Sequence, residues 1–213
     1  MADRYPGYDV LAKRHGPSWN AQTRRVIEER LAVSREPRFL SAEEFATLEA
    51  ITSRIVPQPA GRPAVPVAAL VDDKLVRDEG DGYRAERMPR HRESWKRGLA
   101  ALDAESRETY GRAFRALSPA QQDELLTKAQ AGELRSPAWG GMPSHTFFSQ
   151  RLLYDVVGAY WSHPTAWSEM GFGGPASPRG YVRLDYDERD PWEAAEDRPG
   201  ESQAARRHNR HVR

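Results

Sequence analysis

Three histidines are the first residues in this sequence whose type and position could support chemistry. His145 and His163 flank the most apolar segment, and His91 lies in an arginine-rich stretch. Together with Asp155 or Glu169 they could form a histidine/carboxylate metal site, since imidazole and carboxylate groups both bind transition metals. Their spacing matches none of the dense ligand motifs. We therefore interpret them as surface or hydrogen-bonding histidines and assign no metal ligand.

Glycines and serines of the kind found in catalytic loops occur without the required context. Gly171, Gly173 and Gly174 would suit a phosphate or dinucleotide loop, but that fingerprint needs a strand before it and a helix after it. Here a helical pattern precedes the glycines and a Pro-rich segment follows. Ser149 and Ser168 lack the G-x-S-x-G context of a serine nucleophile. The sequence gives no reason to assign a catalytic or a cofactor-binding residue.

A basic run precedes the middle of the chain. Its members are Arg84, Arg87, Arg90, His91 and Arg92. Glu86 and Glu93 interrupt the run, which weakens the case for phosphate binding. A solvated connection, or a rim of salt bridges to a partner, is the interpretation that we adopt.

Aromatic residues are the more informative set, because they are enriched at protein–protein hot spots. Only Trp95 has the pattern of an ordinary helix-core residue. For Trp161 and Trp167, an internal core role and a partner contact are both open. For Trp19 and Trp192, in weakly patterned arms, the composition favours docking on a partner. The candidate interface residues are Tyr5, Tyr8, Trp19, Trp139, Trp161, Trp167, Phe172, Tyr181, Tyr186 and Trp192.

Helix signals place these side chains on an all-α scaffold. Ser41 with Glu44 and Ser118 with Gln121 both have capping-box spacing, and each precedes a helical apolar pattern. The longest such pattern begins near Thr146 and ends before Pro164, where we expect an aromatic, Gly/Pro-rich loop. No alternating strand pattern of useful length is present. The sequence predicts one irregular helical domain of about five to seven helices, with extended N- and C-terminal arms.

Composition and charge exclude several classes of function. The 213 residues are 38% hydrophobic and 30% charged, with a net charge of +1, which gives no general case for binding nucleic acid. The absence of cysteine removes disulfides, iron–sulfur clusters and thiol catalysis. No apolar run approaches the roughly 18 residues of a membrane span. Arg24-Arg25 resembles a twin-arginine export box, but Glu28 and Glu29 follow where apolar residues are required, so we expect a cytoplasmic protein.

Two segments carry a family resemblance. They are LSAEEFATLEAITSRIVPQP, from Leu40, and GAYWSHPTAWSEMGFGGPASPRGYV, which includes Tyr181. Their order and spacing resemble the gluconate 2-dehydrogenase subunit 3 family over roughly Leu40 to Tyr181. Neither segment is a catalytic motif.

The resemblance implies a non-catalytic small subunit that binds and stabilises a large FAD-dependent dehydrogenase of the glucose-methanol-choline type. The FAD would lie in that partner, which would act on a sugar, a glycoside or an alcohol. The residues leave two alternatives open, an autonomous enzyme with a histidine/carboxylate metal site and a helical adaptor unrelated to redox chemistry. A periplasmic location would require export by the partner's signal.

The resulting division of the chain has four parts. We expect an N-terminal arm (residues 1–20), a helical domain (21–182), a C-terminal strap (183–197) and a disordered basic tail (198–213). The arms carry aromatics without enough apolar neighbours to fold alone.

Overall fold

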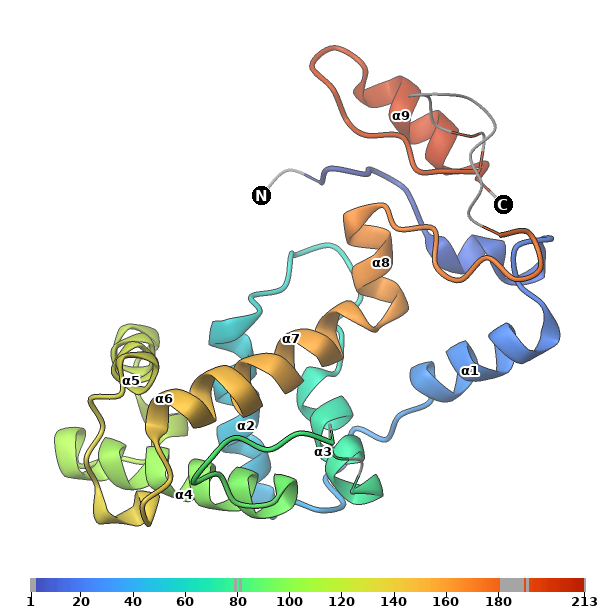
Figure 1. Ribbon diagram of the computed structural model, residues 1–213. Helices are drawn as coiled ribbons and strands as arrows, with labels where there is room; N and C mark the ends of the chain where they lie inside the picture. The colour runs from blue at the N-terminus through green and yellow to red at the C-terminus, as the bar shows by residue number, and fades with distance from the viewer. Residues whose placement is uncertain (1–2, 79, 81, 181–189, 191, 213) are drawn as a thin grey trace. The chain divides into compact units, whose positions relative to one another are not determined.

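The computed structural model describes residues 3–78, 80, 82–180, 190 and 192–212. Within these residues the chain forms α-helices, joined by turns and short 3-10 or π-helical segments, and no strand (Figure 1). The all-α fold expected from the sequence is confirmed. The α-helices are α1 (Ala21–Leu31), α2 (Ala42–Ile55), α3 (Val67–Arg77), α4 (His91–Tyr110), α5 (Pro119–Ala131), α6 (Ser144–Phe147), α7 (Tyr154–Trp161), α8 (Pro164–Met170) and α9 (Ser202–Asn209).

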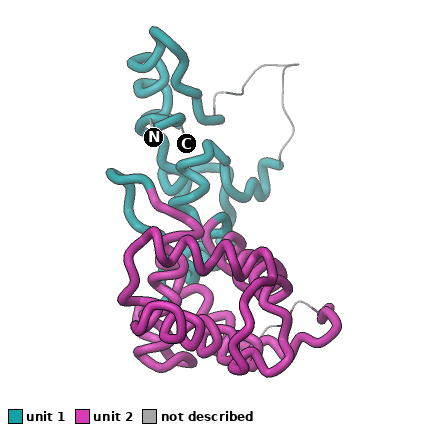
Figure 2. The backbone as a smooth tube through the Cα atoms, turned by 90° about the vertical axis from the view of Figure 1, so that its left-hand side faces the viewer, with its two compact units in different colours: residues 1–33, 59–65, 161–213 teal, residues 34–58, 66–160 magenta. Residues whose placement is uncertain are grey.

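The chain divides into two compact units, where the sequence predicts one domain (Figure 2). Unit 1 combines residues 1–33, 59–65 and 161–213, and unit 2 combines residues 34–58 and 66–160. The linker between α2 and α3 belongs to unit 1 because Arg62 donates hydrogen bonds to the carbonyls of Tyr8 and Tyr5, at 3.2 and 3.1 Å. These contacts connect positions more than 50 residues apart, so no local sequence pattern reports them.

Unit 2 contains the helices that the sequence marks most clearly. Both predicted capping boxes are present, with the side chain of Ser41 accepting from the Glu44 amide and the side chain of Ser118 accepting from the Gln121 amide. A buried carboxylate also fixes the entry to α2. Asp72 on α3 accepts the backbone N–H groups of residues 38–40, at 2.7 to 3.3 Å.

The core of unit 2 forms where α2 packs against α3 and α4. Its fully buried side chains include Leu48, Ile51, Leu75, Trp95, Leu99, Leu102, Phe114 and Phe147. Gly98 lets the ring of Phe147 approach α4, since a Cβ at this position would lie 2.1 Å from a ring carbon. The same ring meets Trp95 edge to face, with the centroids 5.7 Å apart.

The predicted long helix begins three residues earlier than expected: its N-cap is Pro143 instead of Thr146, and its first helical residue is Ser144. It consists of α6, a π-helical turn η4 (Phe148–Leu153) and α7 in direct succession. Such π-helical turns occur often at functional positions. Here the turn ends two residues before Asp155, the buried acid described below.

Unit 1 contains α1, α8, α9 and the 3-10 helix η1 (Val10–His15). The loop expected after His163 is instead the helix α8. His163 caps it by accepting the Thr165 amide, Pro164 takes the first helical position, and Gly171 ends it at φ 71°. Each of these signals is present in the sequence, but the Gly/Pro content of the segment obscured them.

Unit 1 also orders parts of the chain for which we expected extended or disordered arms. Helix α9 forms within residues 198–213, the predicted disordered tail. The amide of Asp197 donates to the carbonyl of Arg4 at 2.8 Å, and the side chain of Asn209 donates to the carbonyl of Pro6 at 3.0 Å. The shared core comprises Tyr5, Tyr8, Val10, Trp19, Ile27, Trp167, Ala194 and Val212.

No helix in the described ranges combines the length and the apolar character needed to cross a membrane.

Candidate functional site

The predicted interface aromatics fall into three groups. Trp161 and Phe172 are 41% and 39% exposed, and Trp192 is partly buried. Five are buried within the chain, namely Tyr5, Tyr8, Trp19, Trp139 and Trp167. Tyr181 and Tyr186 lie outside the described residues. A role in partner binding remains a prediction for all ten residues. The five buried residues are core residues of the isolated chain.

Trp167 organises the aromatic surface of α8 in unit 1. Its indole N–H donates to the carbonyl of Trp161 at 2.7 Å, and its ring meets Phe172 edge to face, with the centroids 5.8 Å apart. Met170, which the sequence analysis did not single out, is 47% exposed at the end of the same helix. Trp167 thus contacts two exposed aromatic residues, Trp161 and Phe172.

Helix α7 carries a second unusual exposed feature, an aromatic pair around a glycine. Tyr154 is 59% exposed, Gly158 is exposed, and Trp161 ends the helix. Their i, i+4, i+7 spacing places them on one helical face. Nothing lies within 4 Å of the position that a Cβ on Gly158 would occupy. The protein's own packing therefore gives no reason for a glycine here, although glycine destabilises a helix interior by about 1 kcal/mol relative to alanine.

The most densely hydrogen-bonded acid in unit 2 is Asp155, whose side chain is 0% exposed. It accepts from Lys74 Nζ at 2.8 Å, from His91 Nε2 at 2.7 Å and from Trp95 Nε1 at 2.7 Å. Burial favours the neutral acid, but these hydrogen bonds outweigh it and lower the pKa of Asp155 below its ordinary value. A carboxylate that has three donors and no solvent contact is not accessible to a substrate or a metal ion.

The other candidate ligands do not assemble around that acid. His163 caps α8, and His145 is exposed, with its Nε2 3.2 Å from the hydroxyl of Thr146. Across the described residues, no three side chains of the His, Cys, Asp or Glu type lie close enough together to hold a metal ion. The structure thus brings together His91 and Asp155 from the predicted set, in a hydrogen-bonded pair inside the core.

The basic run does not form one patch. His91 points to Asp155, whereas Arg92 donates to the carbonyls of Leu75 and Val76 at 2.6 Å each and so holds the end of α3. Arg87 takes a left-handed backbone conformation, with φ 64°, and lines a pocket of about 400 Å³. The run is therefore divided between the core, a helix end and the surface.

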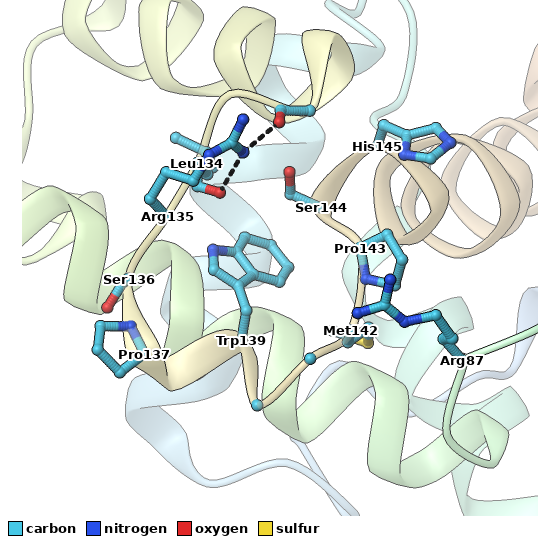
Figure 3. Close-up of a pocket in the computed structure, with 13 residues that line it drawn as sticks. Arg87, Leu134, Arg135, Ser136, Pro137, Trp139, Met142, Pro143, Ser144 and His145 are labelled. Carbon is cyan, nitrogen blue, oxygen red and sulfur yellow. Dashed lines mark hydrogen bonds between the residues drawn. The ribbon is translucent and has the colours of Figure 1, made fainter.

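Figure 3 shows this pocket in unit 2, with Arg87, Arg135 and His145 drawn around Trp139. Arg135 is engaged with the carbonyls of Gly132 and Leu134. Trp139 donates its indole N–H to Glu105 at 3.0 Å, which fixes it as an internal residue. The lining contains basic side chains and no acidic one, so the pocket is suited to a negatively charged group at the surface.

A smaller pocket of about 280 Å³ lies in unit 1, at the glycines after α8. Its lining includes Lys13, which is 0% exposed and whose Nζ has no hydrogen-bond acceptor among the residues that the structure describes. Burial, reinforced by the positive charge of Arg179, lowers the pKa of Lys13 to about 8, while Glu193 acts in the opposite sense. Gly171, Gly173 and Gly174 line this pocket, so these glycines do border a cavity, although one without the strand–loop–helix context of a dinucleotide site.

Sequence reasoning missed Lys13, Lys74, Gly158 and Met170. Lys74 and Met170 occur in segments where long or apolar side chains are common, so their types gave no signal. A glycine inside an otherwise apolar helical pattern was the one available clue, at Gly158. The other residues that line the pocket of Lys13 lie more than 150 positions later in the sequence.

Comparison with known proteins identifies the family. The family model for gluconate 2-dehydrogenase subunit 3 matches residues 42–174, which include α2 to α8. No curated protein and no solved structure matches the chain. The family match spans more than half of the 213 residues and overlaps both segments from which the resemblance was drawn. The chain belongs to the gluconate 2-dehydrogenase subunit 3 family, a family of dehydrogenase subunits.

Proposed function

We propose that this chain is a non-catalytic accessory subunit that binds and stabilises a large FAD-dependent dehydrogenase. The partner would be of the glucose-methanol-choline type and would act on a sugar, a glycoside or an alcohol. The observation that carries this proposal is the family match over residues 42–174. The hydrogen bonds of Asp155 support the assignment as a non-catalytic subunit, since they engage the His91–Asp155 pair inside the core.

The face of α7 that carries Tyr154, Gly158 and Trp161 is the surface that we assign to the partner. Large aromatics at a protein surface contribute strongly to binding when a partner covers them. A glycine between them lets a backbone of the partner approach the helix closely. A partner surface on this face would give the exposed glycine the role that packing within the chain does not provide.

Binding of this kind links the stability of the two subunits. A partner that binds only the folded chain shifts the folding equilibrium in proportion to its concentration over the dissociation constant. The large subunit benefits by the same relation. Loss of the accessory subunit would therefore lower the abundance of the large one without altering its catalytic residues.

Purification of the tagged chain from its native host tests the proposal directly. The expected result is co-elution with a larger polypeptide that carries flavin absorption and dehydrogenase activity. Flavin or dehydrogenase activity in the separated small chain would contradict the non-catalytic assignment. Elution without any flavoprotein partner would favour the helical adaptor.

Two substitutions on α7, Gly158→Ala and Trp161→Ala, test whether this face binds the partner. Gly158→Ala should stabilise the isolated chain by up to about 1 kcal/mol, because alanine is the better helix former and meets no atom within 4 Å. The same variant should weaken the complex, because its methyl group blocks the close approach. Calorimetric melting of the chain and a binding titration with the large subunit measure the two effects.

Gly98, a glycine inside helix α4, provides a matched control. Gly98→Ala should destabilise the isolated chain, since its Cβ would lie 2.1 Å from the ring of Phe147. If Gly158→Ala leaves complex formation unchanged while Trp161→Ala also has no effect, the α7 face is not the interface.

We also propose that the protein acts in the cytoplasm. Arg24 and Arg25 lie inside α1, whose cap is Asn20, and Arg24 donates to the carbonyl of Trp19 at 2.6 Å. The pair is thus part of a folded element. Residues 1–40 fused to an export reporter should give no twin-arginine-dependent transport, and clear transport would overturn this location.

A further inference from the structure

The pocket around Lys13 contains a buried cation whose Nζ has no hydrogen-bond partner among the described residues. Lys13 enters from η1, and Gly171 to Gly174 form the opposite part of the lining after α8. Nζ of Lys13 lies 3.1 Å from the position that a Cβ on Gly173 would take. The absence of a side chain at Gly173 therefore leaves the space in front of the amine open.

The amine itself is buried without an acceptor. Lys13 is 0% exposed, and its Nζ makes no hydrogen bond, although an ammonium group carries three donors. Nζ also lies over the ring of Tyr8, 5.9 Å from the ring centroid. Removing a charge from water without pairing it is strongly unfavourable, so native proteins rarely retain such a group without a use.

The other charges of the lining do not supply the missing acceptor. Arg179 is a second cation whose charge acts on Lys13, and its guanidinium stacks on Trp192 at 4.7 Å. Glu193 lies near enough to influence Lys13, but its Oε2 accepts the backbone N–H of Asp190 at 2.8 Å. The lining thus contains one further cation, Arg179, and two carboxylates, Asp190 and Glu193, and neither carboxylate accepts a hydrogen bond from the amine.

We propose that this pocket binds a small free oxyanion, a phosphate or a short carboxylate, which accepts hydrogen bonds from the Lys13 ammonium. The volume of about 280 Å³ is enough for a group of a few heavy atoms. Charge-assisted hydrogen bonds from an ammonium to such an oxyanion are roughly twice as strong as neutral ones. The anion would stabilise unit 1, to which η1, α8 and residues 192–193 all belong.

The test measures anion-dependent stabilisation of the full chain at pH 7, with inorganic phosphate, acetate and chloride compared at constant ionic strength. Phosphate or acetate should raise the melting temperature in a saturable way, and the two responses identify which oxyanion is preferred. Lys13→Met keeps the length of the side chain and should weaken the binding at least tenfold. Glu193→Gln removes a nearby negative charge and should strengthen the binding several-fold.

Lys128→Met is the matched control, because Lys128 is an exposed lysine paired with Glu124 in unit 2. It should leave the anion response unchanged. The absence of a saturable response in the unmodified chain would overturn the proposal, and so would an equal response in Lys13→Met.

A chemical measurement covers the case in which Lys13→Met does not fold. Amine labelling of the unmodified chain, followed by mass spectrometry, reports the labelling rate of each lysine. Saturating phosphate or acetate should slow the labelling of Lys13 several-fold relative to that of Lys128. Equal slowing at both lysines, or none at Lys13, would show that the anion does not occupy this pocket.

Discussion

Asp155 in unit 2 and Lys13 in unit 1 are both buried charges, but they are paired in opposite ways. Asp155 accepts hydrogen bonds from three donors on α3 and α4. Lys13 has three donors of its own and no acceptor. Burial alone therefore does not define the role of a charged group. The number of hydrogen bonds that the group makes within the chain distinguishes a structural group from a candidate ligand-binding group.

The comparison also explains why the His91–Asp155 pair does not support the predicted alternative of a metal site. His91 and Asp155 were considered as possible metal ligands, and they do meet, but Lys74 and Trp95 complete the coordination of the acid. A metal would have to displace a cation and an indole from a site without solvent access. The same chemistry at the surface would have supported the metal alternative.

The largest expected effect is that of Asp155→Asn. Loss of the carboxylate leaves the Lys74 ammonium without its counter-charge and His91 and Trp95 with a poorer acceptor. Breaking a buried pair in this way lowers the free energy of unfolding by about 3–5 kcal/mol. Urea denaturation of the variant measures the change.

Glu93→Gln provides the control, since Glu93 pairs with Arg97 on the exposed side of α4. That variant should change the free energy of unfolding by less than about 1 kcal/mol. Equal effects of the two substitutions would remove the distinction between a saturated buried acid and a surface one.

The second prediction is an increase in stability for Lys13→Met in anion-free buffer at pH 7. Methionine fills similar space without the unpaired ammonium, so the free energy of unfolding should rise by about 1–3 kcal/mol. Chemical denaturation measures it. A marked loss of stability would mean that the ammonium is already satisfied, and the contrast with Asp155 would disappear.

The third prediction concerns the dependence of stability on pH, which differs in sign for the two groups. A carboxyl with a lowered folded pKa contributes stability that is complete above its unfolded pKa, 3.8 for Asp155, and is lost as the pH falls through the folded value. Lys13 has the lower pKa in the folded state, about 8 against 10.5, so the unfolded chain binds more protons between these values and stability rises with pH there.

The contribution of each group is measured by subtracting the free energy of unfolding of a variant from that of the unmodified chain at each pH. The curve for the unmodified chain minus Asp155→Asn should fall on the acid side, and that for the unmodified chain minus Lys13→Met should rise between pH 8 and 10. Tyr8, Arg179 and Glu193 face Lys13, and burial raises the pKa of Tyr8, so stability linked to Tyr8 falls above pH 10. A flat Lys13 difference curve below that limit would contradict an unpaired amine.

Local signals explain how much of the fold was predictable from the sequence. The capping boxes at Ser41 and Ser118 operate over three residues, and both were identified correctly. The start of α8 at Pro164 has equally local signals, but the aromatic and glycine content after it favoured a loop. Helix α9 lacks a strong apolar stripe, and its order depends on contacts such as that of Asn209 with Pro6.

The candidate sites were less predictable because they depend on distant pairs. The hydrogen bond between His91 and Asp155 spans 64 residues. Lys13 and Gly173 are still further apart in the sequence, and Lys13 lies in a segment with no sustained periodicity. Residue type identified aromatics that are able to bind a partner, but exposure decided which of them remain available, and exposure is set by tertiary packing.

The joining of the two chain ends in unit 1 has a consequence for synthesis. Residues 34–160 contain every segment of unit 2, so this unit can fold while later residues are still being added. Unit 1 needs Arg4 and Pro6 to meet Asp197 and Asn209, and it must wait until nearly the whole chain has left the ribosome. During that interval Tyr5, Tyr8 and Trp19 lack the C-terminal residues of their core, and exposed apolar side chains of this kind make a folding intermediate prone to aggregation.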